Sequence, residues 1–116
     1  MKTESEKTLE ARLVREITDR GGMALKYTSQ YHRGIPDRII LMPHGRTYFV
    51  ELKSSGKRPT RLQQHAIERI TALGYFAAVV DSTEGLELLL LTIDKDQGYF
   101  AAKGKEIDVK RKEISK

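Results

Sequence analysis

Two apolar runs on either side of a short polar turn constrain the fold of this chain more than any other feature. The first run lies at the end of the segment Gly34–Leu41, and the second lies at the start of the segment Phe49–Lys53. The turn Pro43–Arg46 lies between them. Apolar runs of this length around a proline and a glycine are typical of neighbouring strands that are covered on both faces. We therefore predict a β-hairpin, with strands over about residues 37–42 and 47–53.

Charged side chains stand at the ends of both runs that lie far from the turn. Asp37 enters the first strand, and Glu51 and Lys53 leave the second. When the hairpin closes, these ends meet, so two carboxylates and an amine converge. Acidic side chains can hold a divalent metal, and a lysine beside it can orient water and offset charge in a transition state. These three side chains together predict a phosphodiester hydrolase. The alternative is that Glu51 and Lys53 are ordinary surface residues of an edge strand.

This convergence depends on the length of the turn. A two-residue turn would place Asp37 opposite Leu52 and send Glu51 to the other face, because side chains alternate along a strand. An odd loop such as Pro43–Gly45, or a bulge where the first strand begins, would bring Asp37 and Glu51 together. Lys53 follows Glu51 by two positions and shares its face in either case.

A helical pattern precedes the hairpin, from about residue 5 to 20. Leu9, Leu13 and Ile17 recur at every fourth position, and a glycine pair follows as a stop signal. Glu10 lies at the edge of this apolar stripe. It is either a solvated side chain at the rim of the core or an acid that the helix aims at the metal site.

The metal site itself is predicted from oxygen ligands. Mg²⁺ prefers an octahedron of oxygens and keeps several waters, so a few protein ligands suffice. The candidates are Asp37, Glu51, Glu10 and the backbone carbonyl of Leu52. The chain has no cysteine and no two histidines spaced four apart, which argues against thiolate-bound or histidine-bound zinc.

The other elements are predicted from the same kinds of pattern. They are a strand over 23–31, a helix from Thr60 to about 73, a strand over 75–80 and an apolar segment over 83–91. For the last segment we favour a helix over a strand, because Ser82 or Thr83 could cap it. From Asp94 onward the chain is polar and rich in turn-forming residues. The order α-β-β-β-α-β favours an α/β fold, with a mixed sheet and helices on its faces.

A basic cluster follows the second strand of the hairpin. It holds Lys53, Lys57, Arg58 and Arg61 within nine residues and no acid, in a chain with a net charge of +5. With Lys26, the last three are candidates to bind a DNA backbone. A solvated loop could have the same composition.

Gln63 follows Thr60 by three positions at the start of the second long helix. This spacing predicts a capping box, in which the two residues satisfy each other's backbone N–H groups. The same glutamine would face the cleft beside the hairpin, where its amide could hold water or phosphate.

The length and composition fit one cytoplasmic domain over residues 1–116. A chain of 116 residues can bury a core without disulfides. No apolar run reaches the roughly 18 residues that a membrane span requires. The charged N-terminus lacks the apolar core of a signal peptide.

Several segments together resemble a known family. They are Gly34–Asp37, Phe49–Lys53, Thr60–Gln63 and Gly74–Tyr75, with Gly21–Gly22 before Lys26–Tyr27. Over about residues 6–90 the chain is similar to the virus-type replication-repair nuclease (VRR-NUC) family, in its stand-alone phage or bacterial form. This family belongs to the PD-(D/E)xK, restriction-endonuclease-like superfamily. The resemblance implies an αβββαβ core and leaves residues 91–116 as an extension without an assigned role.

The resemblance also implies an activity. It implies a Mg²⁺- or Mn²⁺-dependent DNA endonuclease. By likeness to stand-alone members that cut branched DNA such as four-way junctions, it also implies a homodimer in bacterial or phage-infected cells. By this likeness Asp37, Glu51 and Lys53 carry the core motif, Glu10 is the acid of the first helix and Gln63 is the glutamine of the second. Two alternatives stay open: a non-catalytic DNA-binding module of the same fold, and a restriction enzyme that cuts one fixed sequence.

Overall fold

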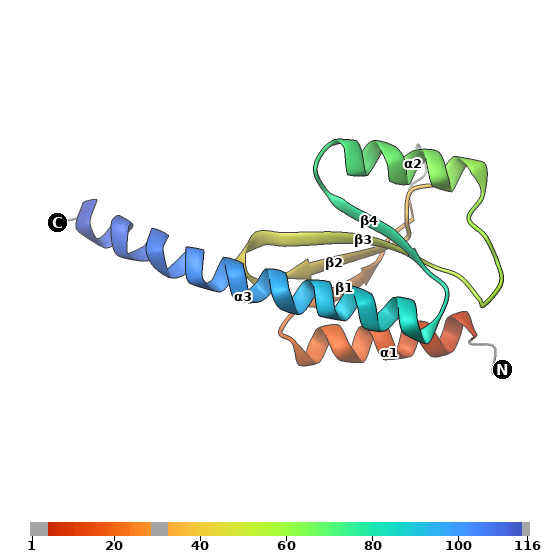
Figure 1. Ribbon diagram of the computed structural model, residues 1–116, viewed down its shortest axis with the longest axis horizontal. Coiled ribbons are helices and arrows are strands. Elements are labelled where there is room, and N and C mark those ends of the chain that lie inside the picture. The colour runs from red at the N-terminus through yellow and green to blue at the C-terminus, as the bar shows by residue number, and fades with distance from the viewer. Residues whose placement is uncertain (1–4, 29–32, 115–116) are drawn as a thin grey trace.

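The elements follow one another in the predicted order, with a long helix added at the end (Figure 1). A computed structural model describes residues 5–28 and 33–114, with side chains up to residue 99. The elements are α1 (Glu6–Asp19), β1 (Met23–Lys26), β2 (Arg38–Met42), the short 3₁₀ turn η1 (Pro43–Gly45), β3 (Arg46–Leu52), α2 (Arg61–Ala72), β4 (Phe76–Val80) and α3 (Thr83–Ile114). None of the helices in these described ranges is long and apolar enough to cross a membrane.

The strands form one mixed sheet in the order β1-β2-β3-β4. The pairs β1–β2 and β2–β3 are antiparallel, and β3–β4 is parallel because α2 carries the chain back across the sheet. Figure 1 shows α1 and α3 on one side of the sheet and α2 on the other. The prediction of an α/β fold with a mixed, helix-flanked sheet is confirmed.

The hydrophobic core lies between the sheet and the layer of α1 and α3. Its buried side chains come from both helices and from β2, β3 and β4: Leu9, Leu13, Ile17, Ile40, Met42, Tyr48, Val50, Leu52, Val80, Leu86, Leu89, Leu90 and Ile93. On the other side, α2 contributes only Ala66 to the fully buried hydrophobic residues of the described chain. The two faces of the sheet therefore differ, and the face under α2 has room for polar groups.

The hairpin has the odd loop that convergence required. Met42 pairs with Arg46 across Pro43–Gly45, and Arg38 pairs with Val50. The turn is possible because His44 and Gly45 both have positive φ, of 66° and 75°. Continued by one residue, this register places Asp37 directly opposite Glu51.

The predicted helix boundaries hold at both short helices. Ser5 caps α1 by accepting the Thr8 N–H. Thr60 and Gln63 form the predicted capping box at the start of α2. Gly74, with a φ of 93°, follows the end of α2 as the sequence indicated.

Two predicted boundaries were wrong. The first strand ends at Lys26 and does not run to residue 31, and residues 29–32 lie outside the described part of the chain. The segment from 83 is a helix, as favoured, with Ser82 accepting the Gly85 N–H. However, α3 continues to Ile114 through the stretch predicted to be rich in turns, and its C-terminal half extends beyond the sheet (Figure 1).

Contacts with other elements hold residues 93–96 of α3 in the helix. Asp94 binds Arg20 of α1, with a distance of 2.7 Å between Oδ1 and Nε, and Asp96 accepts the Tyr48 hydroxyl at 2.6 Å. Ile93 is fully buried in the hydrophobic core. Residues that are typical of a turn are therefore held on a helix, because each has a partner on another element.

Candidate active site

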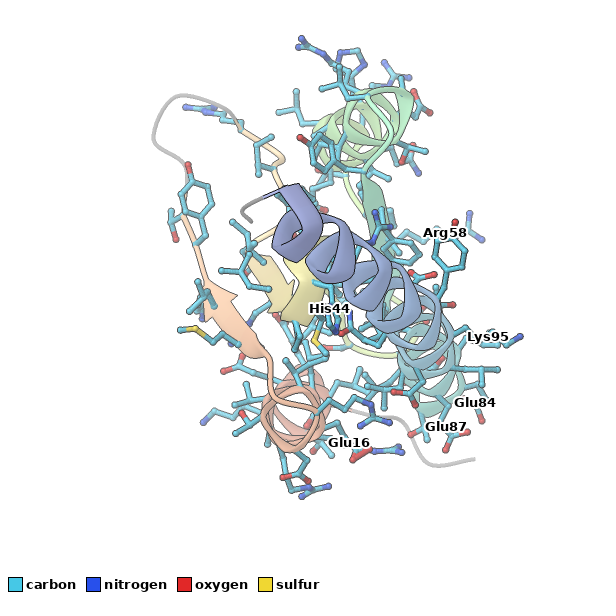
Figure 2. All side chains as sticks on the ribbon, turned by 90° about the vertical axis from the view of Figure 1, so that its left-hand side faces the viewer. Glu16, His44, Arg58, Glu84, Glu87 and Lys95 are labelled. Carbon is cyan, nitrogen blue, oxygen red and sulfur yellow. The ribbon has the colours of Figure 1, made fainter. Side chains whose placement is uncertain are left out.

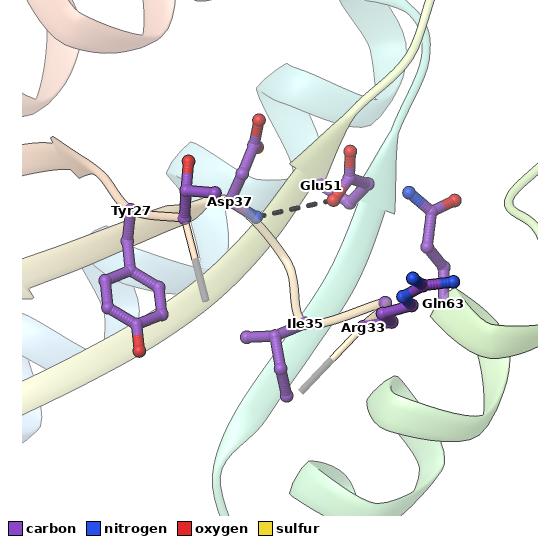
Figure 3. A pocket seen from close by; sticks show the side chains of 8 residues that line it. Tyr27, Arg33, Ile35, Asp37, Glu51 and Gln63 are labelled. Carbon is purple, nitrogen blue, oxygen red and sulfur yellow. Dashed lines mark hydrogen bonds between the residues drawn. The ribbon is translucent and has the colours of Figure 1, made fainter. Parts of the chain in front are cut away.

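A polar pocket of about 280 Å³ lies on the α2 side of the sheet, where β2 begins and β3 ends (Figure 3). It is lined by Tyr27, Thr28, Arg33, Gly34, Ile35, Asp37, Glu51 and Gln63. Three of the sequence-predicted site residues, Asp37, Glu51 and Gln63, thus meet in one cavity although they come from three separate segments.

Asp37 is fixed by backbone hydrogen bonds on both sides. Its N–H donates to Glu51 Oε1 at 3.3 Å, and its carbonyl accepts the N–H of Tyr27 at 2.7 Å. The Tyr27–Asp37 bond extends the β1–β2 ladder past the start of β2, whereas on the β3 side Asp37 is held by the side chain of Glu51. The predicted convergence of Asp37 with Glu51 is therefore present in the structure, and it arises from the odd loop without a bulge.

Lys53 lies beside the same carboxylate. Its Nζ is 3.9 Å from Glu51 Oε2, and its side chain is only 20% exposed. The Lys53 N–H donates to the Val80 carbonyl at 3.0 Å, which ties this end of the hairpin to β4. Lys53 and Glu51 therefore share a face, as their spacing required.

The electrostatics of the pocket favour a bound cation. Burial raises the pKa of Glu51, the nearby Asp37 charge raises it further, and Lys53 partly opposes both effects. Two carboxylates that crowd each other in this way suit a hard cation with oxygen ligands. No cluster of three or more acidic or histidine side chains that could hold a metal occurs within the described residues. Further ligands would thus be backbone oxygens, with Leu52 the predicted one, and water.

Glu10 does not line this pocket. Its Oε1 lies 2.7 Å from Nη2 of Arg38, and this guanidinium is the main cause that lowers the pKa of Glu10. Arg38 follows Asp37, so its side chain points to the opposite face of the sheet, where it is buried beside α1. The acid of α1 whose charge does reach Glu51 is Glu6, in the first turn of the helix, and this charge also raises the pKa of Glu51.

Gln63 combines a capping role with a place in the pocket. Its Oε1 accepts the Thr60 N–H at 2.9 Å, and its own N–H donates to Thr60 Oγ1 at 3.2 Å. The side chain also lines the cavity (Figure 3). The predicted capping box is confirmed, and it leaves the amide NH₂ group available toward the pocket.

The predicted DNA-binding residues lie at the surface outside the pocket. Lys57, Arg58 and Arg61 are exposed on the loop after β3 and at the start of α2, and Lys26 is exposed at the end of β1. Figure 2 shows Arg58 at the surface of the molecule. The cation that lines the pocket is Arg33, which sequence reasoning missed. Its signal was its place directly before Gly34–Asp37.

Comparisons with known proteins show what this chain is similar to. The chain is 40% identical over 79 residues to "Putative nuclease p44" of Acyrthosiphon pisum secondary endosymbiont phage 1, which covers 68% of the chain and 85% of the relative. A solved structure described as a VRR_NUC domain superposes with a TM-score of 0.68 at 24% identity, over 75% of the chain and 96% of that structure. No family model matches the chain.

Proposed function

The chain belongs to the virus-type replication-repair nuclease family, and we propose that this nuclease uses Mg²⁺ to hydrolyse phosphodiester bonds of DNA in the pocket of Asp37 and Glu51. The observation that carries the proposal is the convergence of these two carboxylates, with Lys53 Nζ 3.9 Å from Glu51. A buried carboxylate with a raised pKa, next to another carboxylate and a lysine, is typical of an active site.

Each side chain has a role that follows from its position. Asp37 and Glu51 would hold the metal, with the Leu52 carbonyl as a further ligand. Mg²⁺, or Mn²⁺ with its similar ligand preference, supplies the polarisation of the phosphate and the acidity of a bound water. The Lys53 ammonium would orient the attacking water and offset charge that builds on the phosphate. The Gln63 amide would hold water or phosphate.

The proposed substrate is branched DNA, such as a four-way junction. The exposed cations Lys26, Lys57, Arg58 and Arg61 would bind backbone phosphates, which gives affinity without reading base sequence. A homodimer would place two such pockets on one junction, and the phage relative supports a role in the cytoplasm of an infected cell.

A cleavage panel tests the proposal. Duplex, flap, splayed and four-way substrates are incubated with Mg²⁺ and with wild type, Glu51→Ala or Lys53→Ala. The matched controls are Glu87→Ala and Lys95→Ala, on the exposed surface of α3 (Figure 2). We expect losses of about 10²–10³-fold in rate for the pocket variants and none for the controls.

The outcomes separate the alternatives. If either pocket variant cuts as fast as the wild type, the active-site assignment is wrong. Binding without cleavage of any substrate, independent of metal, would favour a non-catalytic module. Cleavage of plain duplex at one fixed sequence would indicate a restriction enzyme.

A further inference from the structure

The pocket has two chemically opposite walls. Asp37 and Glu51 form the wall that belongs to the sheet, and Arg33 and Gln63 lie together on the side of α2 (Figure 3). The carboxylate wall presents oxygen acceptors and attracts cations. What the α2 wall presents depends on which groups of Arg33 and Gln63 are available.

Gln63 offers only its donor end. Its Oε1 is occupied as the acceptor of the Thr60 N–H, at 2.9 Å, so the NH₂ group is left for the cavity. The capping box therefore also determines the orientation of the amide. A donor held in this way at the first turn of a helix suits an anion, because the helix dipole has its positive end there.

Arg33 is an exposed cation at the same wall. It makes no ion pair with any carboxylate among residues 5–28 and 33–99. The adjoining backbone is held in place, because Gly34 has a φ of 85° and a Cβ there would come within 2.5 Å of the Leu62 carbonyl group. The loop thus packs closely on the first turn of α2, which fixes the point from which the Arg33 side chain leaves the chain.

We propose that Arg33 and the side-chain amide of Gln63 form a phosphate-binding subsite, which holds the DNA backbone phosphate next to the one that is hydrolysed. A guanidinium binds phosphate through two parallel hydrogen bonds, and no other basic side chain lines the described pocket. The subsite also offsets the repulsion between DNA and the carboxylate wall. This inference rests on the proposed function, because the neighbouring phosphate is defined by the position of the reacting one.

The first test measures binding without cleavage. Affinity for a synthetic four-way DNA junction is measured in Mg²⁺ at several salt concentrations, with Arg33→Ala in a Glu51→Gln background. Loss of one phosphate contact should lower the slope of log K against log[salt] by about 0.9. We expect affinity to fall about tenfold. Arg15→Ala, which removes an exposed arginine from α1 on the other side of the sheet, is the matched control and should leave both quantities unchanged.

The second test locates the contact. Single neutral methylphosphonates replace the phosphates on either side of the cut position. One of these methylphosphonates should weaken binding by the protein that retains Arg33 but should not weaken binding by the Arg33→Ala variant, both in the Glu51→Gln background. Equal effects of Arg33→Ala and Arg15→Ala, or additive effects at every phosphonate, would overturn the subsite. Failure of the proposed function is distinguishable, because it would show as absence of cleavage by the wild type, whatever the salt slopes are.

Discussion

The ion pair between Glu10 and Arg38 gives the sharpest test of what the first helix contributes. The side chain of Arg38 is 7% exposed and that of Glu10 is 37% exposed, and their closest atoms are 2.7 Å apart. Breaking a fully buried pair costs about 3–5 kcal/mol, because a buried charge is left alone. Exposed pairs contribute about 0–1 kcal/mol. Since water can reach Glu10 but not most of Arg38, we expect Glu10→Gln to cost about 2 kcal/mol.

Urea unfolding with and without Mg²⁺ measures this cost. For a domain of this size, a loss of about 2 kcal/mol corresponds to a fall of roughly 8 °C in Tm. The loss should shrink at acid pH, because a carboxyl group with a lowered pKa stabilises the fold only above that pKa. Adding Arg38→Met to Glu10→Gln should restore most of the stability, since it removes the uncompensated charge. Glu87→Gln, which breaks a 3.6 Å pair between a 61% exposed glutamate and the 31% exposed Arg12, should change stability by less than about 0.5 kcal/mol.

The Glu10→Gln variant also shows whether Glu10 is only the ion-pair partner of Arg38 or is a metal ligand. If Glu10 serves only Arg38, calorimetric titration of Glu10→Gln with Mg²⁺ at a temperature where it is folded should give the wild-type affinity. A fall of about tenfold or more in Mg²⁺ affinity, with unchanged stability, would refute the reasoning and establish Glu10 as the ligand that the sequence suggested.

Three further substitutions test other parts of the structure. In metal-free protein, Glu51→Gln should raise the free energy of unfolding at pH 7, because the raised pKa of Glu51 means that its ionised form destabilises the folded state. This gain should vanish below about pH 4.3, where the carboxyl group is protonated in the folded and unfolded states alike. In urea titrations, added Mg²⁺ should stabilise only the wild type. Burial and a hydrogen bond to a carboxylate of α3 raise the pKa of Tyr48 to about 12. Unfolding free energy should therefore fall by about 2–3 kcal/mol as the pH rises from about 10 to 12, and Tyr48→Phe should lack that share. Gly34→Ala should lower stability by roughly 2–3 kcal/mol, because it combines a positive φ with a backbone clash, whereas Gly45→Ala has a similar φ but open space and should lose only about 1 kcal/mol. Equal thermal shifts for the two glycine variants would contradict the packing of the loop on α2.

The parts of the fold that followed from sequence are those set by local rules. Each of these features depends on residues that are close together in the sequence. They are the apolar period of α1, the capping box of α2 and the odd length of the hairpin loop. The helical state of residues 94–96 in α3 was missed because it depends on partners that are distant in the sequence. Asp94 and Asp96 resemble turn residues until Arg20 and Tyr48 are placed beside them.

The site shows the same division between local and distant information. The convergence of Asp37, Glu51 and Lys53 follows from register alone, so a pattern could predict it. Arg33 enters the pocket because Gly34 packs against α2, and Glu10 meets Arg38 because α1 crosses the sheet. Both depend on how a helix lies on a strand, which no spacing along the chain encodes.

Side chains along β2 and β3 point alternately to the core and to the pocket, so neighbouring residues serve stability and chemistry in turn. Val50 and Leu52 point into the core under α1 and α3, while Glu51 points into the pocket. Glu51→Gln should therefore alter activity with little loss of stability, and it should even stabilise the metal-free fold. Arg38 is the exception, because it is joined to Asp37 but buried on the core side. A substitution of Arg38 should lower both stability and activity. It removes the ion pair that joins β2 to α1, and the residue before it is Asp37 of the site.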